Sequence, residues 1–177
     1  MSTENRNTTR SLGLSLTDDT IDLNKPNVVE AKKQDSNEKK KVIAGLFGMT
    51  KILSKEDIVQ LNLGHSNGNG YYTDPYKAFD QRPGERNKMT ALTRWNHHFE
   101  STDGTARLSY RYYTDTFGVW CSHSGIESSK ELGRNWLVDV KYEDYEQRGD
   151  WCVNGTGDHG LAAFSARSVQ LGVSRAF

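Results

Sequence analysis

The amino-acid sequence predicts an all-β protein built as an antiparallel up-and-down barrel of about eight strands. Three observations lead to this fold class. Apolar and polar residues alternate with a period of two in several segments, as they do when successive side chains of a strand point to opposite faces. Segments rich in turn-forming residues separate these stretches. The chain also has no run of about 18 apolar residues, which excludes a transmembrane helix.

The alternation locates the strands. In residues 107–113, Leu108, Tyr110 and Tyr112 share one face, and polar residues dominate the other. Residues 136–143 alternate in the same way, with Leu137 as the exception. The expected strands, whose boundaries are good to about 2–4 residues, cover residues 10–16, 42–53, 57–65, 89–99, 105–114, 117–128, 135–146 and 163–177.

The connections between these strands differ in length. Short ones with turn signals lie at 54–57, 102–104 and 132–135. Longer ones, which carry Gly, Asn, Pro and charge, cover 17–41, 66–88 and 147–160. This partial alternation of short and long connections is typical of the two rims of an up-and-down barrel. We expect the lysine-rich segment 24–41 to be a solvated polar loop; the competing interpretation is a basic arm for lipopolysaccharide or nucleic acid.

The composition narrows the function. Lysine and arginine total 23, as do aspartate and glutamate. The chain therefore lacks the excess of basic residues that would indicate a nucleic-acid partner. A mean hydropathy of −0.78 leaves little material for a thick soluble core, whereas a barrel in lipid needs only one apolar face per strand. The polar start of the chain lacks the apolar segment of a signal peptide. No histidine or cysteine spacing indicates a metal site, and we expect no cofactor.

Alternation alone leaves open whether the apolar face turns inward, as in a soluble ligand-binding barrel or sandwich, or outward to lipid. Tyrosine and tryptophan near strand ends favour lipid, because such residues form girdles at membrane interfaces. Charges of both signs on the polar face favour a wet lumen. We expect them to fill a narrow barrel or line a wider pore. These charged residues are Arg94, Arg107, Arg111, Asp139, Lys141 and Glu143.

Other candidate sites are weaker. Cys121 and Cys152 could form a disulfide in an oxidising compartment. The polar residues Ser122, His123, Ser124 and Asp115 could form a catalytic site at the rim. Because a triad is defined by geometry rather than by composition, we interpret these four as ordinary polar residues and expect no enzyme activity. The terminal Phe177 closes an alternating strand and resembles the signal read by the outer-membrane barrel assembly machinery.

A series of segments along the chain is distinctive in its order: 12–15 (LGLS), 19–22 (DTID), 53–63 (LSKEDIVQLNL), 70–77 (GYYTDPYK), 82–83 (RP), 108–115 (LSYRYYTD), 117–118 (FG), 122–123 (SH) and 163–164 (AF). With these segments the chain resembles the domain of unknown function 3570 family, whose members look like bacterial outer-membrane barrels. Family members are longer and begin with a signal peptide. The chain is therefore similar to the C-terminal portion of such a protein, truncated at its start.

The resemblance implies one barrel domain or barrel segment over residues 1–177, located in the outer membrane of a Gram-negative bacterium. The resemblance implies no settled activity; from the charged polar face we expect a structural or pore-like role without catalysis. Implied partners are outer-membrane lipid, the assembly machinery through Phe177, and periplasmic redox or flavin-transfer proteins. Two alternatives stay open: a soluble periplasmic β-protein that binds a small ligand, and an outer-membrane enzyme with a rim serine–histidine site.

Overall fold

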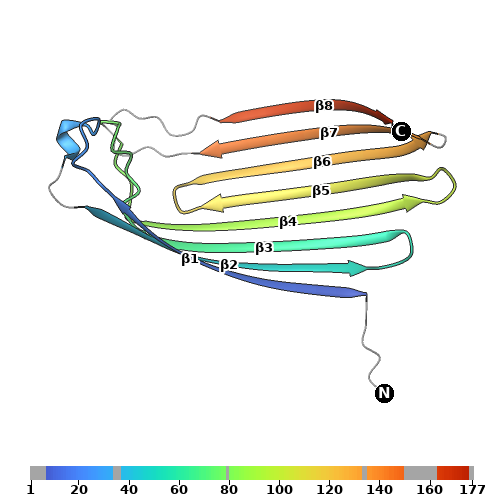
Figure 1. Cartoon of the computed structure of the whole chain (residues 1–177), viewed down its shortest axis with the longest axis horizontal. Helices are drawn as coiled ribbons and strands as arrows, with labels where there is room; N and C mark the ends of the chain where they lie inside the picture. Colours follow the sequence, from blue (N-terminus) through green and yellow to red (C-terminus); the bar gives the residue numbers. More distant parts are fainter. Residues whose placement is uncertain (1–6, 34–36, 79, 133–134, 150–162, 176–177) are drawn as a thin grey trace, which may run out of the picture.

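Eight antiparallel strands form one sheet in chain order in the computed structural model, which describes residues 7–33, 37–78, 80–132, 135–149 and 163–175 (Figure 1). One 3-10 turn, η1 (Glu30–Lys32), lies between the first two strands. The all-β, up-and-down prediction is therefore confirmed. The strands are β1 (Thr8–Ile21), β2 (Glu38–Ile52), β3 (Asp57–Gly70), β4 (Glu85–Phe99), β5 (Gly104–Asp115), β6 (Val119–Leu132), β7 (Trp136–Gly149) and β8 (Phe164–Arg175).

Most strands are longer than the alternation predicts. One difference concerns the lysine-rich segment 24–41, which is not a loop throughout, because β2 already begins at Glu38. Cross-strand charge explains the extension: Lys40 and Lys41 lie directly opposite Asp19 and Asp18 of β1. The Nζ of Lys41 lies 3.4 Å from a carboxylate oxygen of Asp18. Opposite charges that face each other across two strands stabilise the pairing.

The sheet has two distinct faces, because residues directly opposite each other in neighbouring strands lie on the same side. We call one the apolar face; its large apolar residues are Leu12, Leu14, Leu16, Ile43, Phe47, Met49, Val59, Leu61, Leu63, Met89, Trp95, Leu108, Tyr110, Tyr112, Ile126, Val138, Val140, Tyr142, Val169, Leu171 and Val173. The opposite side is the polar face. Among the described residues, no second layer of sheet or helix covers either face.

The strands are staggered relative to one another. The row of direct partners that starts at Leu14, in the middle of the apolar residues of β1, reaches Thr114 of β5 after four strand pairings. Tyr110, the middle of the apolar residues of β5, lies four residues away from Thr114. At about 3.3 Å per residue and about 4.8 Å per strand, this stagger tilts the apolar band by about 35°. Closed β-barrels have strand tilts in this range.

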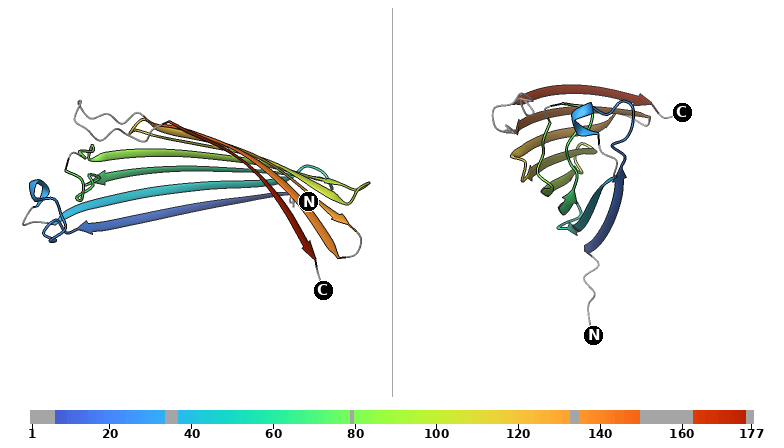
Figure 2. Two further views of the ribbon diagram at one scale, coloured as in Figure 1. Left: turned by 90° about the horizontal axis from the view of Figure 1, so that it is seen from above. Right: turned by 90° about the vertical axis from the view of Figure 1, so that its left-hand side faces the viewer.

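The sheet is open. In the described residues its outer strands β1 and β8 pair only with β2 and β7, so the ring of a barrel is not closed. Figure 2 shows the consequence: the strands curve into a trough, with β1 and β8 along its two margins. Strand count and direction therefore agree with a barrel, whereas closure needs a further pairing at both edges.

A small core lies at one end of the sheet, where the β1–β2 and β3–β4 connections meet (Figure 1). We call the described residues 22–33, 71–78 and 80–84 the rim cap. Leu23, Val28 and Phe117 are the buried hydrophobic residues of the described chain, and Leu23 is fully buried. The Tyr72 ring packs edge-on against Phe117, with ring centroids 5.7 Å apart. Conventional core packing is thus confined to the rim and does not cover the faces of the sheet.

Candidate functional site

The polar face gathers the six charged residues that the sequence selects. Across β4 and β5, Arg94 lies directly opposite Ser109, which has the same orientation as Arg107 and Arg111. Across β6 and β7, Glu127 lies opposite Lys141. Glu127 also lies opposite Arg107, and this connects the two halves of the set. The register places all six on this face, and their lumen-facing role stays a prediction; the six are Arg94, Arg107, Arg111, Asp139, Lys141 and Glu143.

The two arginines nearest the short-turn end are held by neighbouring strands. Arg107 forms an ion pair with Glu127 of β6, with Nη1 to Oε2 at 3.1 Å, and its Nε donates to the Asn96 side-chain oxygen at 2.9 Å. Arg94 donates from Nη1 to the Gln60 side-chain oxygen at 3.3 Å. The Nε of Arg94 is buried and has no hydrogen-bond partner in the part of the chain that the structure describes.

Glu143 is the centre of a second group on β6 and β7. Its Oε1 lies 2.7 Å from Lys141 Nζ and 3.2 Å from His123 Nε2. Gly125 lies directly opposite Glu143. A Cβ at that position would lie 2.8 Å from the Ser109 hydroxyl, closer than real Cβ contacts, so a larger residue would displace its neighbours. The absent side chain leaves room at the position directly opposite Glu143.

Two of the six predicted residues do not join these pairs. Within the described ranges, no ion pair or side-chain hydrogen bond involves Arg111 or Asp139. Arg111 lies opposite His123. Asp139 lies opposite Gly172, and a Cβ there would collide with its carboxylate. Of the six residues, Arg107, Lys141 and Glu143 therefore form ion pairs. Arg94, Arg111 and Asp139 form none among the described residues.

A further charged cluster lies at the long-connection end and was missed from the sequence. The Asp115 carboxylate is fully buried and forms an ion pair with Arg86. It accepts hydrogen bonds from the Tyr113 hydroxyl at 2.7 Å and from the backbone N–H groups of Phe117 and Val119 at 2.9 and 3.1 Å. The Arg86 guanidinium also lies 4.6 Å from the Phe117 ring centroid. The Asp-x-Phe-Gly turn was the available signal, since aspartate at this position commonly accepts backbone N–H groups.

The residues considered for a catalytic rim site do not converge. His123 lies on the polar face and pairs with Glu143, whereas its sequence neighbours Ser122 and Ser124 point to the apolar face. The carboxylate of Asp115 forms an ion pair with Arg86 rather than a contact with His123. Cys121 has a free thiol. Cys152 and Phe177 lie outside the described residues, so the disulfide and the assembly signal stay predictions.

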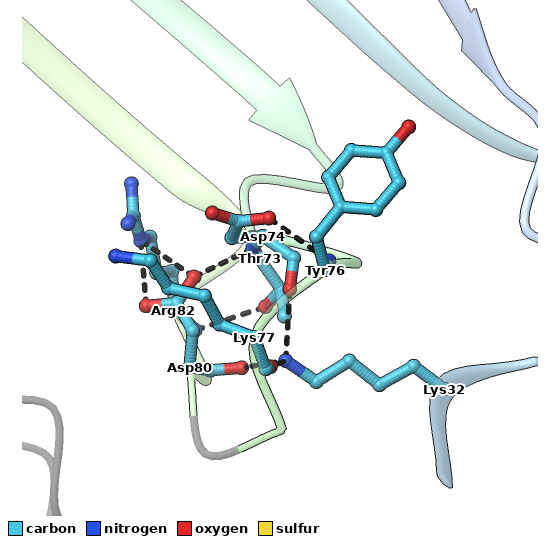
Figure 3. A network of polar contacts seen from close by, with 7 residues as sticks. All are labelled: Lys32, Thr73, Asp74, Tyr76, Lys77, Asp80 and Arg82. Atoms are coloured by element: carbon cyan, nitrogen blue, oxygen red, sulfur yellow. Dashed lines mark hydrogen bonds and ion pairs between the residues drawn. The ribbon is translucent and has the colours of Figure 1, made fainter. Parts of the chain in front are cut away.

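The rim cap is held together by one lysine. Lys32 extends from the β1–β2 connection to three backbone carbonyl oxygens of the β3–β4 connection (Figure 3). Its Nζ donates to the carbonyl oxygens of Asp74 at 2.9 Å, Asp80 at 2.6 Å and Lys77. The buried carboxylate of Asp80 binds Arg82 Nε at 2.9 Å and accepts the Asp74 N–H. One ammonium group thus connects segments that are more than 40 residues apart.

Replacing Lys32 with methionine should loosen the β3–β4 connection. A hydrogen bond to a charged group contributes about 1.5–3 kcal/mol, and the substitution removes the ammonium while keeping much of the side-chain volume. We expect faster amide hydrogen exchange at Asp74 and Arg82, whose N–H groups are bonded inside this connection. The Lys33→Met variant is the control. Lys33 forms an exposed ion pair with Glu30, so its loss should leave exchange unchanged. Equal protection in both variants would contradict the role of Lys32.

The apolar face is exposed along the whole sheet. Leu12, Leu14 and Leu16 are 86, 76 and 71% exposed on β1, and Leu171 is 72% exposed on β8. Apolar side chains of the inner strands are exposed as well; Val140 of β7 is 45% exposed. Large apolar side chains exposed over a contiguous surface mark a site of contact with lipid or protein.

Aromatic and basic residues lie near the ends of this face. At the short-turn end, Trp95 Nε1 donates to Asp57 at 2.9 Å, and the Arg175 guanidinium lies 5.2 Å from the Trp136 ring centroid. At the long-connection end, the Arg148 guanidinium lies 5.6 Å from the Trp120 ring centroid. Amphipathic rings beside cationic groups suit the boundary between hydrocarbon and water.

Comparisons with known proteins give one match. A family model described as "Protein of unknown function (DUF3570)" matches residues 1–177. No curated protein and no solved structure matches the chain. Among the described residues, no three metal-binding side chains gather into a potential metal site. No helix in the described ranges is long and apolar enough to cross a bilayer.

Proposed function

Because this chain belongs to the DUF3570 family of proteins of unknown function, whose roles are open, we propose that it is an outer-membrane β-barrel protein of Gram-negative bacteria. In this proposal its role is structural or pore-like and does not involve catalysis. The apolar face contacts lipid, and the polar face faces an aqueous or charge-filled lumen. Phe177 engages the barrel assembly machinery, and periplasmic redox or flavin-transfer proteins are further partners.

One observation carries this proposal: a band of large apolar side chains runs along one face of the sheet, and no second layer packs against it among the described residues. A sheet in a water-soluble domain buries its apolar face against a second layer. Here the side chains of Leu12, Leu14 and Leu171 are more than two-thirds exposed. Burying such a side chain is favourable by about 1.5–3 kcal/mol, so a face with many of them needs an apolar environment. Lipid hydrocarbon provides that environment without any further chain.

The dimensions of the sheet fit a bilayer. The strands have 12 to 15 residues. A transmembrane strand needs about 9–11 tilted residues, so each strand crosses and still extends into the interfaces. The tilt of about 35° lies within the range of membrane barrels. Trp120 and Trp136, at opposite ends of the apolar face, suit the two interfacial girdles.

The polar face suits a lumen. It carries both signs of charge, and the pairs Arg107–Glu127 and Lys141–Glu143 neutralise one another at 3.1 and 2.7 Å. Such pairs are tolerated in a wet or side-chain-filled interior, whereas on the lipid face each charge would be costly. These two pairs lie on the face opposite the band of large apolar residues, and this supports the outward assignment of the apolar face.

The test is folding of the purified chain into lipid vesicles, followed by gel mobility with and without heating and by circular dichroism. We expect a compact band that shifts on heating, together with a strand spectrum in lipid. Folding in plain buffer without lipid would overturn the proposal in favour of a soluble ligand-binding β-protein. A chain that folds in neither medium would also overturn it for this chain.

A further inference from the structure

We propose that the polar face binds a small organic carboxylate in a pocket that spans β1 to β5, with Lys88 as its cationic group. The pocket has a volume of about 400 Å³. Ligand pockets in proteins measure about 300–1,000 Å³, so a small solute fits. The inference rests on the proposed function for access to this face through a lumen, and it goes further by naming the class of solute.

Two adjacent rows of direct partners on the polar face build the pocket. The row nearer the short-turn end consists of Gly13, Leu46, Gly64, Thr90 and Tyr113. The row nearer the long-connection end consists of Ser15, Ala44, Ser66, Lys88 and Asp115. All of these residues except Asp115 line the pocket. Because directly opposite residues of antiparallel strands share a face, these side chains surround one space.

Glycines keep the floor of the pocket apolar and open. Leu46 lies directly opposite Gly13 on β1 and Gly64 on β3, and its side chain is 54% exposed. A Cβ at Gly64 would collide with the Thr90 hydroxyl and would lie 3.6 Å from Leu46 Cδ1. A Cβ at Gly13 would lie 3.5 Å from the Cβ of Leu46. Larger residues at these two positions would therefore cover the leucine, whereas the glycines leave its surface to a ligand.

Lys88 supplies a positive charge that the protein itself does not pair. Its side chain is half-buried, and within the described residues it forms no ion pair and no hydrogen bond. The acid directly opposite is Asp115, whose two carboxylate oxygens already have partners. One oxygen binds Arg86 and the Tyr113 hydroxyl, and the other accepts two backbone N–H groups. An anion in the pocket would therefore gain a charge-assisted hydrogen bond from a partly desolvated ammonium.

Hydroxyl groups next to Lys88 complete the polar part of the pocket. Ser66 lies directly opposite Lys88, and Thr90 lies two residues further along β4 on the same face. A carboxylate held at the ammonium can accept hydrogen bonds from both hydroxyls. One cation and two hydroxyl donors beside an apolar floor suit a carboxylate that is attached to a hydrocarbon body.

The neighbouring cations explain why the expected ligand is a carboxylate rather than a phosphate. Arg86 already forms an ion pair with Asp115. Lys40 lies directly opposite Asp19, and its Nζ lies 5.1 Å from the Tyr72 ring centroid. Phosphate favours several cationic donors, as in arginine clusters. The ammonium of Lys88 is sufficient for a single carboxylate.

Fluorine NMR of para-fluorobenzoate, titrated against the protein folded into lipid vesicles, tests the proposal. The ring of this probe is the apolar body, and its carboxylate is the partner of Lys88. We expect the fluorine line to shift and broaden with protein, and the neutral analogue para-fluorobenzamide to bind at least about tenfold more weakly. Lys88→Met should weaken binding of the carboxylate by at least about tenfold, because it removes a hydrogen bond to a charged group. Vesicles without protein give the blank.

The control variant Lys130→Met removes the same charge outside the pocket. Lys130 is exposed near the end of β6, directly opposite Val138 of the apolar face. Its loss should change the dissociation constant by less than about twofold. Equal weakening by the two variants, or equal binding of the acid and the amide, would overturn the site. Displacement of para-fluorobenzoate by inorganic phosphate at the same concentration would overturn the organic class of the ligand.

The heat-dependent gel shift of the same samples separates failure of the site from failure of the proposed function. An inserted chain without binding that depends on Lys88 would overturn the site and leave the membrane function standing. A chain that folds only in plain buffer and binds the probe through Lys88 would overturn the membrane function and support the site. A chain that folds in neither medium would overturn both.

Discussion

Replacing Val140 with arginine should lower the stability of the lipid-folded protein by about 2–4 kcal/mol. Val140 lies on the apolar face in the middle of β7, directly opposite Leu171 and Ser128, away from both ends of the strand. In the proposed orientation the arginine would meet hydrocarbon near the bilayer centre, where a charge is most costly. The Leu108→Arg variant on β5 should show a similar loss. Urea titration of protein folded into vesicles measures both.

The control adds the same charge to the other face. Ser168 of β8 lies directly opposite Glu143, so the Ser168→Arg variant gains an acidic neighbour within an already polar surface. We expect a change of less than about 0.5 kcal/mol, as for substitutions away from special structural features. Equal costs for Val140→Arg and Ser168→Arg would contradict the assignment of the two faces.

Asp115→Ala should destabilise the fold by about 3–5 kcal/mol, because it leaves a partly buried guanidinium without its counter-ion. The aspartate side chain is fully buried and that of Arg86 is 21% exposed. The substitution also removes the acceptor for the Tyr113 hydroxyl and for two backbone N–H groups of the turn between β5 and β6. The measurement is again the free energy of unfolding by denaturant titration.

An exposed pair provides the comparison for Asp115. Asp144 lies 3.5 Å from Arg167 Nε, with both side chains at least one-third exposed. Its replacement by alanine should cost about 0–1 kcal/mol, since solvent screens exposed pairs. If Asp115→Ala were as mild as Asp144→Ala, the rim cluster would not hold the long-connection end of β5 in place.

The local alternation of apolar and polar residues in the sequence was sufficient to predict the strands and which side chains share a face. The alternation of Leu108, Tyr110 and Tyr112 with charged neighbours fixes which side chains share a face, because the strand period is two whatever the partner strand. The same rule placed Arg107, Lys141 and Glu143 on one surface before any register was known. Strand ends were predicted less well. The extension of β2 back to Glu38 depends on Asp18 and Asp19 across the sheet, which no local pattern contains.

The tertiary structure alone decided the contacts that join distant segments. Lys32 meets carbonyl groups of the β3–β4 connection more than 40 residues away, and Arg86 meets Asp115 across 29 residues. Neither pair has a sequence signature, because the partners are adjacent only once the strands are in register. Whether β1 and β8 pair with each other also depends on the tertiary structure. The alternation in the sequence predicts that both strands have an apolar side. The curvature of the whole sheet determines whether the two strands lie close enough to pair.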